Sequence, residues 1–231
     1  MNADVGQSEV AMDIRESYDS AAAAYAEHLL DELARKPLDR HLLNRFAEET
    51  RGRGLVADLG CGPGHVARYL SEHGVTIFGV DFSSKMVAVA QSLHPDLDFR
   101  VEDMRRLSAS DASLAGVVLF YSIVHFDLTD LPAVFREARR VLAPSGLALV
   151  SFHCVEEIVH RDELFGAAVS LDFRCHTSDN VVDALRSADL AVIEQVHREP
   201  YDGAEYPSRR CYLVARAAEQ QHSAGGAARR R

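Results

Sequence analysis

Residues 55–65 read Leu-Val-Ala-Asp-Leu-Gly-Cys-Gly-Pro-Gly-His, and this stretch decides the fold. Its first five residues are mostly apolar and predict a short buried strand, and a helix is expected to begin near Gly64. The glycines at positions 60, 62 and 64 tolerate positive φ and have no Cβ to block a ligand. A strand, a glycine turn and a helix N-terminus together predict a pocket of backbone N–H groups at the edge of a sheet.

A dinucleotide-binding turn is the main rival interpretation of this stretch. Its G-x-G-x-x-G pattern requires a third glycine at position 65, which is His65 here. Asp58 lies two residues before the first glycine, and its carboxylate would repel a pyrophosphate but suits a cationic ligand. The pattern therefore favours a cationic ligand over NAD, although a tight βα turn without any ligand also remains open.

Two further acidic positions follow the next predicted strands. Residues 75–80 form an apolar, β-branched run that predicts a buried parallel strand, and it ends in Asp81 and Phe82. Asp81 follows Gly60 by about 20 residues, the separation that brings an acidic side chain to a ribose in a βαβ unit. Residues 97–101 alternate as a third strand, which ends before Glu102-Asp103-Met104. The acid at Asp103 could equally be a helix N-cap for the short turn that follows it.

The remainder of the chain completes an alternating pattern of strands and helices. Residues 114–121 and 147–152 predict two more buried strands, with an amphipathic helix over 131–142 between them. Two last strands over 190–196 and 210–215 are joined by a linker too short for a crossover helix, so they are expected to be antiparallel. Residues 153–177 have no clear period and are interpreted as an insertion on the binding side of the sheet.

The N-terminal segment is expected to be helical over residues 11–36. Asp19 or Ser20 is predicted to cap a second helix there, over residues 21–35. Tyr18 and Tyr25 lie on this N-terminal segment, outside the predicted core of the sheet. Both tyrosines could cover a ligand, or could simply pack the helix onto the sheet.

The pattern Asp58-x-Gly60-x-Gly62-x-Gly64, with Asp81, Asp103 and the reversed last strands, resembles the class I S-adenosylmethionine (SAM) dependent methyltransferases. The similarity is closest to the ubiquinone-biosynthesis-like group that methylates small molecules. This resemblance implies an α/β, Rossmann-like seven-stranded sheet of order 3-2-1-4-5-7-6, with the last strand antiparallel, helices on both faces and an N-terminal helical lid.

The same resemblance implies SAM as the cofactor and a set of residues that bind it. Asp58 would orient the ammonium group, Asp81 the ribose hydroxyls, Phe82 the adenine ring and Asp103 the adenine amino group. The complete expected cofactor set is Tyr25, Asp58, Gly60, Cys61, Gly62, Gly64, Asp81, Phe82, Asp103, Met104 and Tyr121.

An acceptor hydroxyl or amine must also lose a proton, and histidine is suited to accept it near neutral pH. His125 follows the fourth strand and is the first candidate for the catalytic base, and His153 at the end of the fifth strand is the second. Each could instead be a structural histidine. No metal is expected, because the spacing of His125, His153 and His160 matches no ligand motif.

The composition of the chain narrows the range of binding partners that we expect for it. A net charge of -10 argues against a nucleic-acid partner, and no apolar run approaches a membrane span. The four cysteines show no disulfide or zinc spacing, and the sequence has no signal peptide, so a cytoplasmic protein is expected. The expected organisation is a flexible terminus (1–10), one methyltransferase domain (11–217) and a flexible tail (218–231), in a monomer or homodimer.

The expected function is methyl transfer from SAM to an oxygen or nitrogen of a small-molecule acceptor. The alternatives are a SAM-binding protein without transferase activity and an NAD-dependent dehydrogenase.

Overall fold

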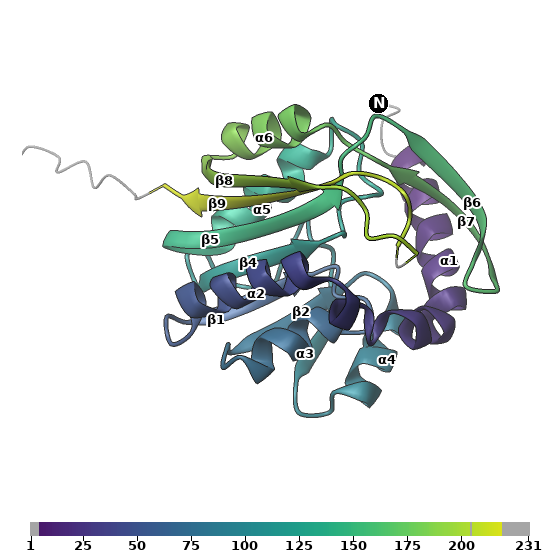
Figure 1. The fold of residues 1–231 in the computed structure, drawn as a ribbon, viewed down its shortest axis with the longest axis horizontal. Helices are drawn as coiled ribbons and strands as arrows, with labels where there is room; N and C mark the ends of the chain where they lie inside the picture. The colour runs from purple at the N-terminus through teal and green to yellow at the C-terminus, as the bar shows by residue number, and fades with distance from the viewer. Residues whose placement is uncertain (1–4, 204, 219–231) are drawn as a thin grey trace, which may run out of the picture.

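The computed structural model describes residues 5–203 and 205–218, with side chains from Ile14 onward. Figure 1 shows a twisted sheet at the centre with helices on both of its faces. The helices are α1 Val5–Leu29, the short 3-10 helix η1 Glu32–Arg35, α2 Pro37–Thr50, α3 His65–Glu72, α4 Ser84–Leu93, α5 Leu131–Val141 and α6 Ser178–Ser187. The strands are β1 Leu55–Leu59, β2 Ile77–Asp81, β3 Asp98–Val101, β4 Leu114–Phe120, β5 Leu142–His153, β6 Ile158–Leu164, β7 Ala167–Arg174, β8 Leu190–Arg198 and β9 Arg210–Ala217.

The sheet has the predicted topology. Its seven strands run in the order β3-β2-β1-β4-β5-β9-β8, which is 3-2-1-4-5-7-6 when the strands of this sheet are numbered along the chain. The first five are parallel, and β9 is antiparallel to both β5 and β8. The fold class inferred from the sequence is therefore confirmed. Because the parallel strands all end at the same edge, the residues that follow β1, β2 and β4 meet there.

Two hydrophobic clusters cover the two faces of the sheet. One contains buried residues of α2, α3 and α4, such as Phe46, Leu70 and Ala90. The other contains buried residues of α5 and α6, such as Phe135 and Leu185. Apolar residues of the central strands face both clusters, which explains why those strands read as continuous apolar runs.

The segment 153–177 is better ordered than its sequence indicated. It forms a two-stranded antiparallel hairpin, β6–β7, outside the main sheet. Almost every residue of β6 is exposed or half-buried, so no side of the strand required a regular apolar pattern. The hairpin lies beside α1 at the carboxyl edge of the sheet, where the Ser170 amide donates a 3.0 Å hydrogen bond to the Ser17 hydroxyl (Figure 1).

The predicted helix boundary at Asp19 or Ser20 is wrong, because α1 runs through both residues without a break. Their side chains make tertiary contacts instead of capping a helix. Asp19 accepts hydrogen bonds from the Ser83 hydroxyl (2.5 Å) and the Lys85 amide (3.1 Å) at the start of α4. Ser20 donates to the carbonyl of Ala168 in β7. Of the predicted flexible termini, 1–10 and 218–231, residues 1–4 and 219–231 lie outside the described residues, and residues 5–10 belong to α1.

A buried ionic network joins α2 to the last two strands. The carboxylate of Asp39 is fully buried and accepts hydrogen bonds from Arg198 of β8 (3.0 Å) and Tyr212 of β9 (2.9 Å). The Tyr121 hydroxyl, just after β4, reaches the same carboxylate at 3.3 Å. Burial raises the pKa of Asp39, while Arg198 and Tyr212 oppose that rise. This network fixes the position of Tyr121 at the carboxyl edge of the sheet.

No helix among the described residues is long and apolar enough to cross a membrane.

Replacing Asp39 with alanine is expected to lower the free energy of unfolding by about 3–5 kcal/mol, because it leaves Arg198 buried without this partner. Chemical denaturation monitored by circular dichroism measures the change. The matched control is Asp183→Ala on α6, which removes an exposed ion pair with Arg186 and should change stability by about 0–1 kcal/mol. Equal effects of the two substitutions would contradict a supporting role for the buried network.

Candidate active site

The glycine turn, residues 60–64, lies at the end of β1 and is packed too closely for side chains at two of its positions. A Cβ at Gly60 would lie 2.5 Å from Cβ of Ser122, and one at Gly64 would lie 2.6 Å from the ring of Phe99. Both glycines also have positive φ, 76° and 82°. Gly62 differs, because a Cβ there would meet only the ring of Tyr25, at 3.7 Å.

The backbone amides of this turn are already used within the protein. The amides of Gly60 and Cys61 both donate to the carbonyl of Val80 at the end of β2. The Gly62 amide donates a 2.9 Å hydrogen bond to Asp81 Oδ2, and the Gly64 amide donates to the Cys61 carbonyl. The expected pocket of free N–H groups is therefore not present in the turn. A turn with no free amides is poorly suited to a pyrophosphate, which disfavours a dinucleotide.

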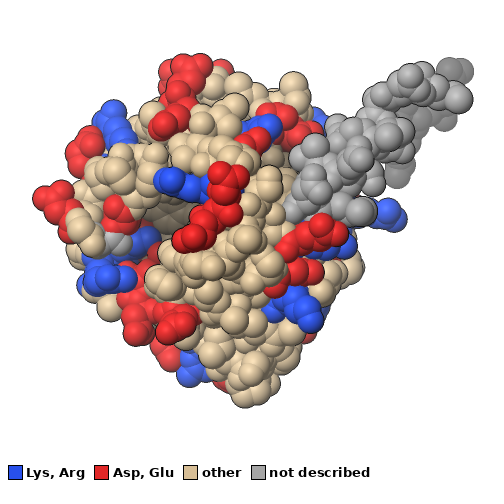
Figure 2. Space-filling model, turned by 90° about the vertical axis from the view of Figure 1, so that its right-hand side faces the viewer, with Lys and Arg blue, Asp and Glu red and all other residues tan. Residues whose placement is uncertain are grey.

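Beside the turn is a cavity of about 510 Å³, within the range of roughly 300–1,000 Å³ that is usual for small-molecule sites. Figure 2 shows it as a hollow with acidic and basic side chains next to it. Of the expected cofactor residues, those that line the cavity are Tyr25, Gly60, Cys61, Gly62, Asp81, Phe82, Met104 and Tyr121. Both candidate catalytic histidines, His125 and His153, line it as well.

Asp81 lies at the end of β2 with both carboxylate oxygens hydrogen-bonded. Oδ1 accepts from the Ser83 amide and Oδ2 from the Gly62 amide, each at 2.9 Å. Burial raises its pKa to about 6, and the amide hydrogen bonds oppose that rise. Asp81 therefore ties β2 to the glycine turn while it faces the cavity. Phe82, directly after it, contributes an aromatic surface to the same side.

Three expected cofactor residues do not line the cavity. Gly64 packs against Phe99, as described above. Asp58 lies beneath the turn with 1% of its surface exposed, and its Oδ2 has no hydrogen-bond partner among the described residues. Burial raises its pKa to about 7, and a hydrogen bond from the Ala67 amide opposes the rise. In this structure Asp58 supports the turn and does not face the cavity directly.

Asp103 turns away from the cavity because a neighbouring arginine binds it. Arg105 donates to both of its carboxylate oxygens through the guanidinium, at 2.7–3.1 Å, and to Oδ1 through its backbone amide at 2.8 Å. Partial burial opposes ionisation, but these hydrogen bonds hold the pKa of Asp103 below its usual value. The hydrogen bond from the Arg105 amide corresponds to the alternative in which Asp103 caps the short turn that follows it. The next residue, Met104, does line the cavity.

His125 is held in one tautomer by two hydrogen bonds. Its Nδ1 lies 2.9 Å from the backbone carbonyl of Asp172 in β7, so Nδ1 carries the proton. Its Nε2 therefore accepts from the hydroxyl of Tyr18 in α1, at 2.8 Å. Burial lowers the pKa of His125 to about 4, which makes the ring neutral at pH 7. The ring thus presents a basic nitrogen to the cavity side of α1, with the Tyr18 hydroxyl bound to it.

His153 has the opposite tautomer. Arg210 donates to the Ser208 hydroxyl oxygen at 2.6 Å, so the hydroxyl hydrogen is left for His153 Nδ1, 2.7 Å away. The remaining proton of this imidazole is then on Nε2, which makes His153 a hydrogen-bond donor and not a base. Burial lowers its pKa to about 3, and the positive charge of Arg210 acts in the same direction.

His160 does not join the other two histidines. It lies exposed on the hairpin, between Asp172 (2.7 Å) and Asp162 (3.0 Å), and does not line the cavity. Within the described ranges, no three His, Cys, Asp or Glu side chains are grouped so that they could hold a metal ion.

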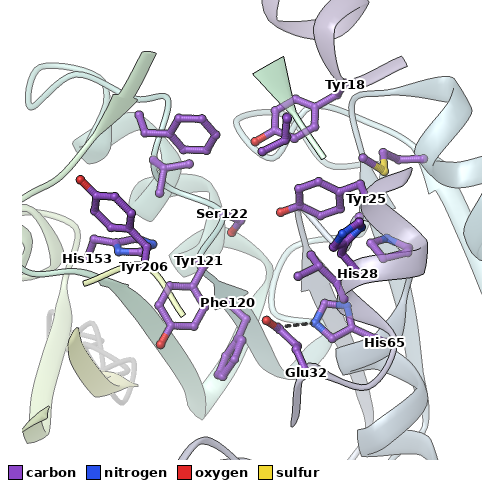
Figure 3. A pocket seen from close by; sticks show the side chains of 18 of the residues that line it. Tyr18, Tyr25, His28, Glu32, His65, Phe120, Tyr121, Ser122, His153 and Tyr206 are labelled. Atoms are coloured by element: carbon purple, nitrogen blue, oxygen red, sulfur yellow. Dashed lines mark hydrogen bonds and ion pairs between the residues drawn. The ribbon is translucent and has the colours of Figure 1, made fainter. Parts of the chain in front are cut away.

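The cavity has two sides, which Figure 3 separates. Tyr18, Tyr25, His28, Glu32 and His65 lie on one side, His153 and Tyr206 lie on the other, and Tyr121 and Ser122 lie between them. The first side includes an ion pair between Glu32 and His65 at 2.9 Å. Burial opposes ionisation of Glu32, but His65 and Lys36 together lower its pKa to about 2.

Several lining residues were not anticipated from the sequence. They come from the hairpin, from the connection between β8 and β9 and from the first residue of β9, and include Arg161, Phe165, Phe173, Glu205, Tyr206 and Arg210. Phe165 at the hairpin tip stacks on His28 of α1, with 4.2 Å between ring centroids, and so closes one wall. No periodicity marks these segments, and the sequence indicated a role in binding only for 153–177, through its position after the fifth predicted strand.

At pH 7, 15N-edited NMR is expected to show His125 as the neutral Nδ1–H tautomer, with a titration midpoint near pH 4 because burial disfavours the imidazolium. The exposed His160 is the internal control, since hydrogen bonds to Asp172 and Asp162 raise its pKa above 6.5. A midpoint for His125 near 6.5, or an Nε2–H tautomer, would contradict the described environment.

Comparison with known proteins identifies the central part of the chain. Residues 56–146 match the model of a methyltransferase domain. The putative methyltransferase YqeM of Bacillus subtilis is 33% identical over 107 residues, which are 44% of this chain and 43% of that protein. The demethylmenaquinone methyltransferase of Thermotoga maritima is 32% identical over 143 residues, or 54% of this chain and 60% of that protein. The chain therefore spans less than two thirds of these relatives.

Among solved structures, the fold is similar to that of the 1,6-didemethyltoxoflavin-N1-methyltransferase of Burkholderia thailandensis, which was solved with 1,6-didemethyltoxoflavin and S-adenosylhomocysteine. The TM-score is 0.70 at 19% identity, over 92% of this chain and 90% of that one. Residues 56–146 are therefore similar in sequence to a methyltransferase domain, and the sheet that contains them has the same fold as a solved methyltransferase with bound S-adenosylhomocysteine.

Proposed function

We propose that the protein transfers the methyl group of SAM to an oxygen or nitrogen atom of a small molecule. The observation that carries this proposal is the two-sided cavity. The glycine turn, Asp81 and Phe82 form one side of it, and His125 and His153 face the space beside them. The relatives named above support SAM as the cofactor, which supplies an electrophilic methyl group on a sulfonium.

The residues on the turn side suit this cofactor. Asp81 is held by two amides in an orientation that leaves its carboxylate at the cavity surface, where it can accept hydrogen bonds from ribose hydroxyls. Phe82 and Met104 offer apolar surfaces to an adenine ring. The amides of the glycine turn are occupied, so this side does not attract an anion and tolerates the positive charge of a sulfonium.

His125 is the proposed base for the acceptor proton. Its Nε2 has a lone pair, and the Tyr18 hydroxyl bound to it lies between the histidine and the cavity. A proton from the acceptor reaches Nε2 through the Tyr18 hydroxyl, or directly once that hydroxyl turns away. His153 takes the complementary role, since its Nε2–H can donate a hydrogen bond to an oxygen of the acceptor.

The surroundings of the cavity also suit a reaction that needs water excluded. Tyr18, Tyr25 and His28 of α1, with Phe165 of the hairpin, cover the turn side (Figure 3). We propose that α1 acts as a lid that orders over the bound cofactor. The acceptor is proposed to be a small molecule because the cavity is enclosed by these side chains, and a monomer or homodimer remains the expected assembly.

A SAM-binding protein without transferase activity is the second candidate. The methyltransferase domain match and the relatives named as methyltransferases favour an enzyme over this alternative. An NAD-dependent dehydrogenase is disfavoured, because the glycine turn has no free amide for a pyrophosphate.

Asp81→Ala is expected to weaken binding of S-adenosylhomocysteine, because each hydrogen bond to the charged group contributes about 1.5–3 kcal/mol. Isothermal titration calorimetry measures the affinity, and a thermal melt checks that the turn remains folded. The control is Asp96→Ala, which removes an exposed partner of Arg68 away from the cavity. Unchanged affinity in Asp81→Ala, or binding of NAD by the native protein, would refute the proposed cofactor site.

His125→Gln is expected to lower turnover about 10²–10⁴-fold while S-adenosylhomocysteine still binds, because a general base contributes about that much. The native rate should fall only when the pH drops toward 4, where His125 becomes protonated. Tyr18→Phe distinguishes the two proton routes. It removes the hydroxyl through which the proton would pass, but it leaves Nε2 of His125 free to accept the proton directly. Turnover near the native value in His125→Gln would assign this residue a structural role.

A further inference from the structure

The side of the cavity opposite the glycine turn has unused hydrogen-bond donors. We call it the acceptor wall and define it as His153, Arg161, Tyr206 and Arg210, all of which line the cavity. Arg161 comes from the hairpin, whereas the other three come from β5, β9 and the connection before β9. These residues are linked by ring contacts, since Arg161 lies 5.4 Å from the ring centroid of Tyr206 and that centroid lies 6.0 Å from the ring of His153.

Arg210 is a buried cation with one donor left over. It is 2% exposed, its Nη1 donates to the backbone carbonyl and hydroxyl of Ser208, and its Nη2 donates to the Tyr206 carbonyl at 2.8 Å. Its ion pair with Glu205 is longer, at 3.3 Å. The Nε–H is buried and has no partner among the described residues. Arg210 therefore adds a fixed positive charge to this side of the cavity.

Arg161 carries the second uncompensated charge. It lines the cavity, and within the described part of the chain it forms no ion pair with a carboxylate; its one described contact is with the ring of Tyr206. The chain as a whole has a net charge of -10, and many of the other described arginines form ion pairs with carboxylates. Because its planar guanidinium can bind a carboxylate through two parallel hydrogen bonds, Arg161 is the natural ion-pair partner for an anion.

The acceptor groups near this wall are already occupied. Glu205 is the acidic residue beside it, and its carboxylate binds Arg198, the Tyr201 amide and Arg210. His153 contributes a third donor, the Nε2–H that its tautomer leaves exposed to the cavity. A ligand at this wall must therefore bring acceptor atoms, and the positive charge of the two arginines favours acceptors that carry negative charge.

The shape of the same region favours a flat ligand. The rings of Tyr121, Tyr206 and Phe173 line it, and the Tyr121 ring lies 5.5 Å from that of His153. Aromatic rings pack well against other rings at such distances. We propose that the methyl acceptor is an aromatic carboxylate, whose ring lies among these side chains and whose carboxylate binds Arg161 at the acceptor wall. The inference rests on the proposed function, in which the cofactor occupies the opposite side.

The carboxylate of the cofactor itself is the competing anion. Lys36 and His65 also line the cavity and both contact Glu32, and they are the other candidate partners for that group. If Arg161 bound the cofactor instead of the acceptor, its removal would weaken binding of S-adenosylhomocysteine. Measuring both affinities in the same variant separates the two assignments.

The test uses the full chain saturated with S-adenosylhomocysteine and titrated with 4-hydroxybenzoate, 6-hydroxy-2-naphthoate and the neutral amides of both. Calorimetry or ligand-observed NMR gives the affinities. In the native protein, at least one of the two carboxylate ligands should bind at least ten times more tightly than its neutral amide. Arg161→Gln should weaken that carboxylate about 10- to 100-fold, the range for a hydrogen bond to a charged group. It should leave the amide and S-adenosylhomocysteine unchanged.

The matched control is Arg186→Gln, which removes an exposed arginine of α6 that does not line the cavity and should change none of these affinities. Equal binding of carboxylate and amide, no binding of either carboxylate, or carboxylate binding that survives Arg161→Gln overturns the inference. Weaker binding of S-adenosylhomocysteine in Arg161→Gln also overturns it and moves Arg161 to the cofactor site. Failure of the native protein to bind S-adenosylhomocysteine overturns the proposed function instead.

Discussion

The close contact between the glycine turn and the chain that leaves β4 is the constraint on which the site depends. At Gly60 there is no room for a Cβ, because Ser122 occupies that position. The amides of Gly60 and Cys61 at the same time bind the end of β2 through Val80. Three strand ends are thereby held together by one turn. Asp81, Phe82 and Tyr121 converge on the cavity as a consequence of this packing.

The same contact determines which ligand the turn can accept. Glycine turns bind phosphate where their amides point to open space. Here the amides of the turn donate hydrogen bonds within the protein, most of them to the end of β2. The nearby acidic groups, Asp58 and Asp81, are both buried and hydrogen-bonded to amides. The turn therefore has no amide to offer to an anion, and Asp81 is the one of these two acids that lines the cavity. The first feature is a property of backbone geometry, and the second of a side chain.

The two histidines divide the cavity into a basic part and a donating part. Each imidazole is neutral because it is buried, and each tautomer is set by a partner on a different element: the Asp172 carbonyl of β7 for His125, and Ser208 for His153. Identical side chains therefore have opposite hydrogen-bonding roles. The hairpin is central to this arrangement, because it holds His125 in place and also brings Arg161 to the opposite wall.

The sequence by itself determined the sheet, its reversed last strand and the position of Asp81. These features follow from local signals, since buried parallel strands require apolar runs and the turn at Gly60 requires glycine. The direction of each polar side chain was decided only by the tertiary structure. Asp58 is covered by the turn, and Asp19 binds α4 instead of capping a helix. The sequence also did not predict the hairpin, because a strand whose two faces are both exposed does not require apolar residues at regular intervals. Arg161 of the hairpin contacts Tyr206 only through long-range packing, which no spacing in the sequence encodes.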